Sequence, residues 1–134
     1  MILLVDDEDR RMDSYVKELE LENHDVHFES NIDDALTFFR DNEAQIELLI
    51  LDVMMPAGSI FSDVGTEYGL MTGIAFYQKI STDHNPDIPT IIFTNVAEES
   101  LTQDITSKST VFFYKKDSLL PFELEEKVRE ILTR

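Results

Sequence analysis

Four short, mainly apolar segments constrain the fold of this chain most strongly, because each of them ends at a polar or charged residue. Segments of this kind are typical of strands that are buried on both faces of a parallel sheet. Ligands of open α/β sheets bind beyond the carboxyl ends of such strands, so we expect the polar side chains to meet at one edge. The segments cover residues 1–5, 47–51, 90–93 and 110–114, and they are followed by Asp6-Asp7-Glu8, Asp52, Thr94 and Lys115-Lys116.

Helical patterns alternate with these strands. Residues 32–39 show the spacing i, i+3, i+4, i+7 of a buried helix face, and Pro121 suits the first turn of a last helix. This alternation of strands and helices predicts an α/β domain with a doubly wound, five-stranded parallel sheet and helices on both faces. We expect residues 1–134 to form this single domain, without a linker or repeat. The other expected elements are a strand over 25–29 and helices over 9–21, 73–80 and 96–107.

The acidic composition excludes several classes of function. The chain has 28 acidic and 11 basic residues and a formal net charge of −17, which repels nucleic acid and anionic membranes. It has no cysteine, so neither a disulfide nor thiol chemistry is expected. Met1 opens directly into a predicted strand without a basic leader, and no apolar stretch is long enough to span a bilayer. We therefore expect a cytoplasmic protein.

Four motifs stand in a characteristic order at the predicted strand ends. They are Leu4-Val5-Asp6-Asp7-Glu8, Leu51-Asp52-Val53-Met54-Met55-Pro56, Thr94 and Phe112-Phe113-Tyr114-Lys115. In this order they resemble the receiver domains of two-component response regulators, and the resemblance covers nearly the whole chain. It implies a flavodoxin-like fold, as in chemotaxis regulators, with strand order 2-1-3-4-5.

The resemblance also implies the chemistry of the site. Asp52 would be the nucleophile that accepts a phosphoryl group from a kinase histidine. Asp7, Asp52 and the main-chain carbonyl of Met54 would bind Mg²⁺ directly, and Asp6 would act mainly through water. Thr94 would donate a hydrogen bond to a phosphoryl oxygen. A hard dication also explains why three mutually repelling carboxylates would be placed together.

Two lysines follow the last predicted strand, and either of them could be the functional one. Lys115 is favoured because it fits the strand alternation better, and Lys116 is the alternative. Phe112, three residues before Lys115, resembles the aromatic switch position that acts with Thr94 in the family, although a core aromatic is the other interpretation. The family usually has a proline after its lysine, whereas here Lys116-Asp117 follows.

Residues 57–72 form a long insertion between the third strand and the third helix, which begins near Gly73. Connections of this type usually contain about 2–6 residues. The segment contains three of the four glycines of the chain. We expect a functional insertion beside the site, and a neutral surface insertion is the alternative. Asn95 is a further departure, because the family usually has a small residue directly after its threonine.

These features predict a phosphorylation-dependent signalling switch that catalyses only its own phosphorylation and dephosphorylation. Its expected partners are a sensor histidine kinase or a histidine phosphotransfer protein and a downstream protein, and phosphorylation-dependent homodimers are compatible with it. The chain either signals by contact or is one domain of a longer protein. One alternative is a degenerate receiver that binds its partner constitutively. The other is an aspartate-nucleophile phosphatase, which would have a second Asp where this chain has Met54.

Overall fold

The computed structural model describes residues 1–56, 58, 72–95 and 108–134, and its centre is a five-stranded sheet. All strand pairs are parallel, and the order is β2-β1-β3-β4-β5. This order confirms the flavodoxin-like sheet expected from the sequence. The strands are β1 (Ile2–Val5), β2 (Val26–Glu29), β3 (Leu48–Leu51), β4 (Thr90–Thr94) and β5 (Val111–Lys115).

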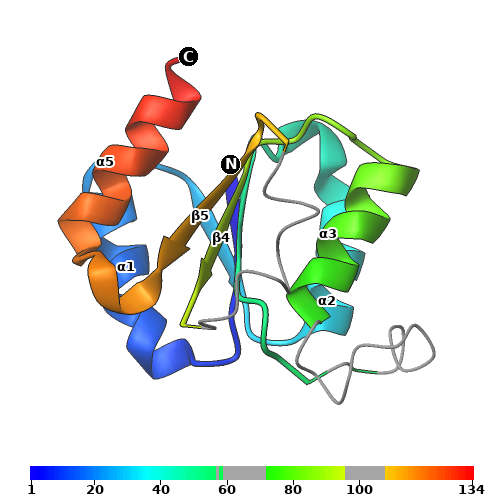
Figure 1. Ribbon diagram of the computed structural model, residues 1–134, viewed down its shortest axis with the longest axis horizontal. Coiled ribbons are helices and arrows are strands. Elements are labelled where there is room, and N and C mark those ends of the chain that lie inside the picture. Colours follow the sequence, from blue (N-terminus) through cyan, green and yellow to red (C-terminus); the bar gives the residue numbers. More distant parts are fainter. Residues whose placement is uncertain (57, 59–71, 96–107) are drawn as a thin grey trace.

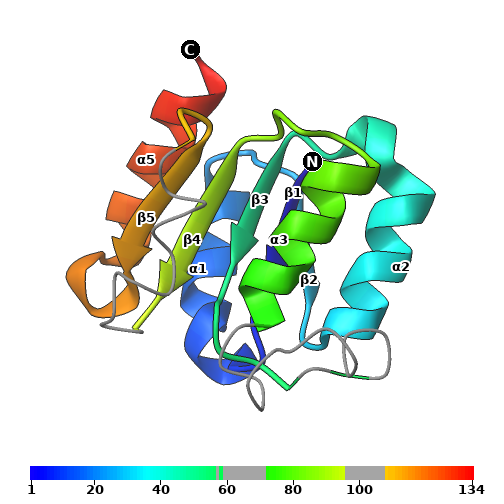
Figure 2. The ribbon, with the colours of Figure 1, turned by 45° about the vertical axis from the view of Figure 1, so that its right-hand side comes forward.

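Helices cover both faces of the sheet. Two of them, α1 and α5, pack on one face, and α2 and α3 pack on the other (Figures 1 and 2). The expected helix over 96–107 and nearly all of the expected insertion over 57–72 lie outside the described residues. The described helices are α1 (Asp9–Leu21), α2 (Ile32–Asn42), α3 (Thr72–Asp83) and α5 (Pro121–Leu132), with the short 3-10 turns η1 (Glu43–Gln45) and η3 (Lys116–Ser118).

The three central strands β1, β3 and β4 are buried on both faces, as their apolar segments predict, whereas most of β5 and all of β2 are half-buried or exposed. Every residue of β1 and β3 is buried, and alternate residues belong to two separate core layers. Leu3 and Val5 pack toward α2 and α3, whereas Ile2 and Leu4 pack toward α1 and α5. Burial of this apolar surface is the main force that fixes the strand ends in space. None of the helices in the described part of the chain is both long and apolar enough to cross a bilayer.

Local signals fix where individual helices begin. The Asn31 side chain accepts a hydrogen bond of 2.8 Å from the Asp34 N–H at the start of α2. At the start of α5 the Glu123 carboxylate accepts one of 2.9 Å from the Leu120 N–H, directly before Pro121. The spacing over residues 32–39 and the position of Pro121 predicted these two helices, and side chains of these types satisfy amide groups that lack a partner in the first turn.

The start of α3 lies very close to the end of β3. A Cβ atom added to Gly73 would lie 1.8 Å from the main-chain oxygen of Asp52, which no side chain tolerates. The Gly73 N–H donates to the Val53 carbonyl oxygen at 2.9 Å. A glycine is therefore required where the helix approaches the residue that follows the central strand.

We predict that Gly73→Ala lowers the free energy of unfolding by roughly 1–3 kcal/mol or more, because the added methyl group must push the helix away from the strand. Urea unfolding followed by circular dichroism measures this change. Gln78→Ala is the matched control, since Gln78 lies on the exposed side of the same helix. Equal stability of the two variants would contradict the close approach.

Candidate functional site

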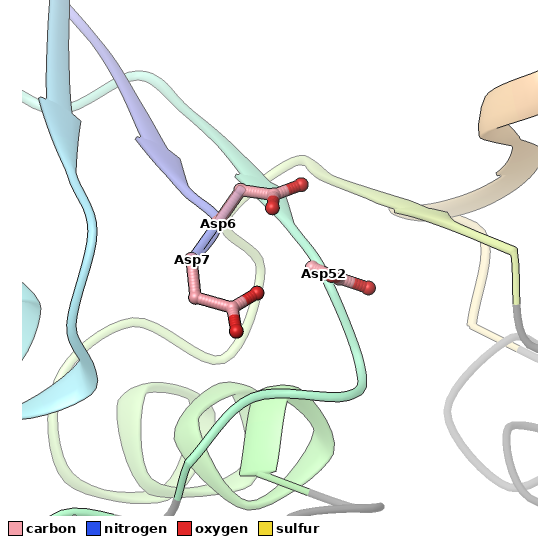
Figure 3. A group of neighbouring side chains, drawn as sticks. All are labelled: Asp6, Asp7 and Asp52. Carbon is pink, nitrogen blue, oxygen red and sulfur yellow. The ribbon is translucent and has the colours of Figure 1, made fainter. Parts of the chain in front are cut away.

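Three carboxylates meet at the carboxyl edge of the sheet. Asp6 and Asp7 follow β1, and Asp52 follows the neighbouring strand β3 (Figure 3). One oxygen atom of each side chain lies within 4.8 Å of the others. The Asp52 N–H donates to the Val5 carbonyl oxygen at 3.0 Å, so the two strand ends are in register. Parallel pairing of β1 and β3 thus brings together residues that are far apart in the sequence.

Burial changes the protonation behaviour of these carboxylates. Asp6 is 1% exposed and Asp52 is 5% exposed, whereas Asp7 is exposed. Burial raises the pKa of Asp6 from 3.8 to about 6, although the hydrogen bond from Lys116 acts in the opposite direction. The pKa of Asp7 is also raised, first by partial burial and then by the charge of Asp52. The site therefore resists carrying all of its negative charges at once.

A single ammonium group lies between the buried carboxylates. The Lys116 Nζ atom is 2.6 Å from Asp6 Oδ2 and 3.1 Å from Asp52 Oδ2, and the side chain is only 2% exposed. Burial alone would lower the pKa of Lys116, but the hydrogen bond to Asp6 and the charges of both carboxylates raise it. The lysine is therefore held in its charged form, and it compensates the buried negative charge.

The position of Lys116 corrects the sequence-based choice of lysine. Lys115 is the last residue of β5 and is exposed, so the expectation that it faces the carboxylates is wrong. Strand alternation favoured Lys115, but alternation ends there because the turn η3 begins at Lys116. The turn directs the next side chain back to the sheet edge. Lys116 had been the alternative for this position.

The position of the expected switch aromatic was counted from the lysine, so the choice of Lys116 changes it. Counted three residues back from Lys116, the position is Phe113 rather than Phe112. Phe113 pairs with Ile92 and packs in the layer of α2 and α3, and Thr94 is two residues beyond Ile92 on the same strand. Phe112 packs in the opposite layer. The structure therefore places Phe112 on the face opposite to Thr94, which corrects the expectation that these two residues act together, and it places Phe113 on the face of Thr94.

Beside the carboxylates lies a hollow of about 170 Å³. Thr94 is 1% exposed at its wall, and Met54 is 48% exposed there. Glu8 and Asn95 also contribute to the wall, a role that the sequence analysis did not assign to them. The complete lining is Glu8, Asp52, Met54, Thr94, Asn95 and Lys116. A nucleophilic carboxylate, a threonine and an ammonium group thus border one small polar space.

The donor set of the cluster suits a hard divalent cation. Its three converging carboxylates offer only oxygen ligands, as Mg²⁺ prefers. Cysteine is absent from the chain, and no histidine belongs to the cluster, so softer transition metals gain nothing there. Asp6, Asp7 and Asp52 are therefore the described residues that could hold such an ion.

The raised pKa of Asp6 predicts that stability falls as the pH rises through the acid range. The folded carboxyl keeps its proton up to about pH 6, whereas the unfolded one releases it near the ordinary value of 3.8. The contribution of protonated Asp6 is therefore present below about pH 4 and is lost by about pH 6. Urea unfolding without divalent cations should show this loss in the parent protein and not in Asp6→Asn.

Between these pH values, the difference in free energy of unfolding between parent and variant should change by on the order of 1–3 kcal/mol. Asp87→Asn is the matched control, because Asp87 is exposed in the turn before β4. It should retain the pH dependence of the parent. A constant difference between the parent and Asp6→Asn across this range would show that Asp6 does not titrate as inferred.

The fold has close counterparts among solved structures. The receiver domain of NtrX from Brucella abortus is 20% identical, with 99% of this chain and 98% of that chain covered and a TM-score of 0.75. The signal receiver domain of a putative Luxo repressor protein from Vibrio parahaemolyticus is 23% identical, with coverages of 99% and 89% and a TM-score of 0.76. The receiver domain of the hybrid histidine kinase CckA is 22% identical, with coverages of 98% and 97% and a TM-score of 0.71.

The sequence itself matches no protein-family model and no curated protein. The similarity is therefore one of fold, and it covers nearly the whole chain. The chain has the fold of response-regulator receiver domains.

Proposed function

We propose that this protein is a phosphorylation-dependent signalling switch whose acceptor is Asp52. The observation that carries the proposal is the position of the Asp52 carboxylate. It lies at the end of the central strand, beside an acidic pair, and 3.1 Å from the Lys116 ammonium group. The same carboxylate borders the hollow that Thr94 also lines.

The proposed reaction transfers a phosphoryl group from a phosphohistidine to Asp52. A carboxylate oxygen attacks the phosphorus atom, the bond from phosphorus to the histidine nitrogen breaks, and an acyl phosphate forms. The nitrogen regains its electron pair, so the balance needs no further reactant. A bound Mg²⁺ would neutralise charge on the transferred group, and Asp6, Asp7, Asp52 and the main-chain carbonyl of Met54 would hold it.

Lys116 and Thr94 supply the remaining stabilisation in this proposal. The Lys116 ammonium group now pairs with two carboxylates, and it needs to move only slightly to contact a phosphoryl oxygen on Asp52. The Thr94 hydroxyl group would donate a hydrogen bond to another phosphoryl oxygen. Preorganised charges of this kind stabilise the transferring group without a large rearrangement.

The signal would leave the site along β4 and β5. Movement of Thr94 toward the phosphoryl group would free space on the face of the sheet where Phe113 packs. The proposed phosphodonor is a sensor histidine kinase or a histidine phosphotransfer protein in the cytoplasm, and one similar receiver does belong to a hybrid histidine kinase. A downstream protein or a second copy of this chain would then bind the altered surface.

We predict that acetyl phosphate with Mg²⁺ adds one phosphoryl group to the parent protein, measured by intact mass, and none to Asp52→Asn. Lys116→Met should slow this labelling about 100-fold, because a preorganised charge at the reacting group is lost. Lys115→Met should label at the parent rate, since that side chain is exposed at the end of β5.

The two lysine variants make the experiment decisive. They replace neighbouring residues of the same type, so a difference between them reflects position alone. Labelling that survives in Asp52→Asn would refute the acceptor, and a parent protein that takes up no phosphoryl group would favour a constitutive interaction module. Turnover of an external phosphoester would revive the phosphatase alternative.

We further predict that Mg²⁺ raises the melting temperature, because it binds only the folded carboxylate cluster. At about 100 times its Kd, an ion that binds the folded state alone adds roughly 2.7 kcal/mol to the free energy of unfolding. Asp7→Asn should remove the response, and Asp87→Asn should keep it. If millimolar Mg²⁺ leaves the melting temperature of the parent protein unchanged, that result would argue against a preformed site.

A further inference from the structure

The turn that carries Lys116 is held by contacts that the proposed chemistry does not use. We propose that Asp117 and Asn95 form a positioning pair, which together with Arg11 fixes the Lys116 ammonium group between the buried carboxylates. The inference rests on the proposed function and deepens it, because these residues would act on phosphoryl transfer only through Lys116.

Asn95 ties the end of β4 to the turn after β5. Its side-chain oxygen accepts a hydrogen bond of 3.1 Å from the Asp117 N–H, and its amide nitrogen lies 3.5 Å from Asp117 Oδ1. The first bond fixes the peptide group that joins Lys116 to Asp117. The orientation of this peptide sets the direction in which the Lys116 side chain leaves the turn.

Arg11 holds the same turn from α1. Its guanidinium group forms an ion pair with the Asp117 carboxylate and lies 3.7 Å from Glu8 Oε2. The other Glu8 oxygen is 3.9 Å from Lys116 Nζ. Charges of alternating sign thus connect Lys116 through Glu8 and Arg11 to Asp117. Ion pairs contribute more when several of them form such a network than when they stand alone.

Tyr15 holds the turn at both of its ends. Its hydroxyl group donates a hydrogen bond of 2.6 Å to the Leu119 carbonyl oxygen, and it also lies 3.4 Å from the Lys116 carbonyl oxygen. The side chain itself is buried in the core layer of α1 and α5. Because this anchor does not involve the Asp117 side chain, the turn should survive replacement of Asp117. Asp117→Ala keeps the main-chain N–H and its hydrogen bond, and it removes the ion pair with Arg11. We therefore expect Asp117 variants to fold.

A plain surface ion pair is the competing interpretation. The Asp117 side chain is 76% exposed and that of Arg11 is 38% exposed, and isolated pairs of this kind contribute little to stability. The two interpretations differ in whether the effect of replacing Asp117 depends on Lys116. If Asp117 positions Lys116, its replacement has no effect once Lys116 is removed. If Asp117 acts on the fold in general, the effect of its replacement persists.

The first test is a double-mutant cycle on the rate of labelling by acetyl phosphate. Asp117→Ala should slow labelling about fivefold in the parent protein, as expected for the loss of one well-placed contact. In a Lys116→Met background it should cause no further change. Asp117 suits this test better than Asn95, because Asn95 lines the hollow and its replacement would also alter access.

The matched control is Asp13→Ala, which removes the 2.8 Å ion pair between Asp13 and Lys17 on the exposed side of α1. It should label at the parent rate in both backgrounds. Equal slowing by Asp117→Ala with and without Lys116, or no slowing at all, would overturn the positioning role.

The second readout does not require phosphorylation. In ¹⁵N-lysine-labelled protein, the buried and ion-paired Lys116 ammonium group should give a resolved signal that disappears in Lys116→Met. The signal should broaden or shift in Asp117→Ala and stay unchanged in Asp13→Ala. If the parent protein is never phosphorylated, the proposed function fails while this measurement still tests the positioning pair. An unchanged ammonium signal in Asp117→Ala would overturn the pair itself.

Discussion

Repulsion between three converging carboxylates, two of them buried, is the constraint on which the rest of this site depends. Asp6, Asp7 and Asp52 converge to within 4.8 Å. Like charges at that separation repel by roughly 3–4 kcal/mol at an effective dielectric of about 20. The parallel pairing of β1 with β3 enforces this approach, because the burial of both strands leaves their ends no freedom to separate. The site therefore requires a cation. Lys116 supplies one from the turn that follows β5.

The same requirement suits the site to switching. An ammonium group shared by two carboxylates can exchange partners with little movement, and a divalent cation can take over part of its role. Adding a phosphoryl group to Asp52 would redistribute these charges. The electrostatic forces on the adjoining strand ends would then change. Under the proposed function, the repulsion between these carboxylates would also drive the change that transmits the signal.

The sequence was sufficient to predict the sheet and the acidic cluster, because both follow from local patterns. Uninterrupted apolar segments identified β1 and β3 as buried on both faces, and the residues directly after them had to lie at the carboxyl edge. The lysine was harder to predict. The alternation of side chains along β5 favoured Lys115, but a tight turn begins at Lys116. The two-residue alternation of a strand does not predict the direction of a side chain in a turn. The expectation for Phe112 was counted from Lys115 and was wrong for the same reason, because Phe112 packs on the face opposite to Thr94.

A crystal structure with Mg²⁺ and beryllofluoride, which mimics a phosphoryl group on aspartate, would test the central claim most directly. The account predicts beryllofluoride on Asp52, the cation among the three carboxylates, and the Lys116 ammonium group turned from Asp6 toward a fluorine atom. A structure in which Lys115 makes that contact, or in which Lys116 keeps both carboxylate partners and Asp52 stays unmodified, would contradict it.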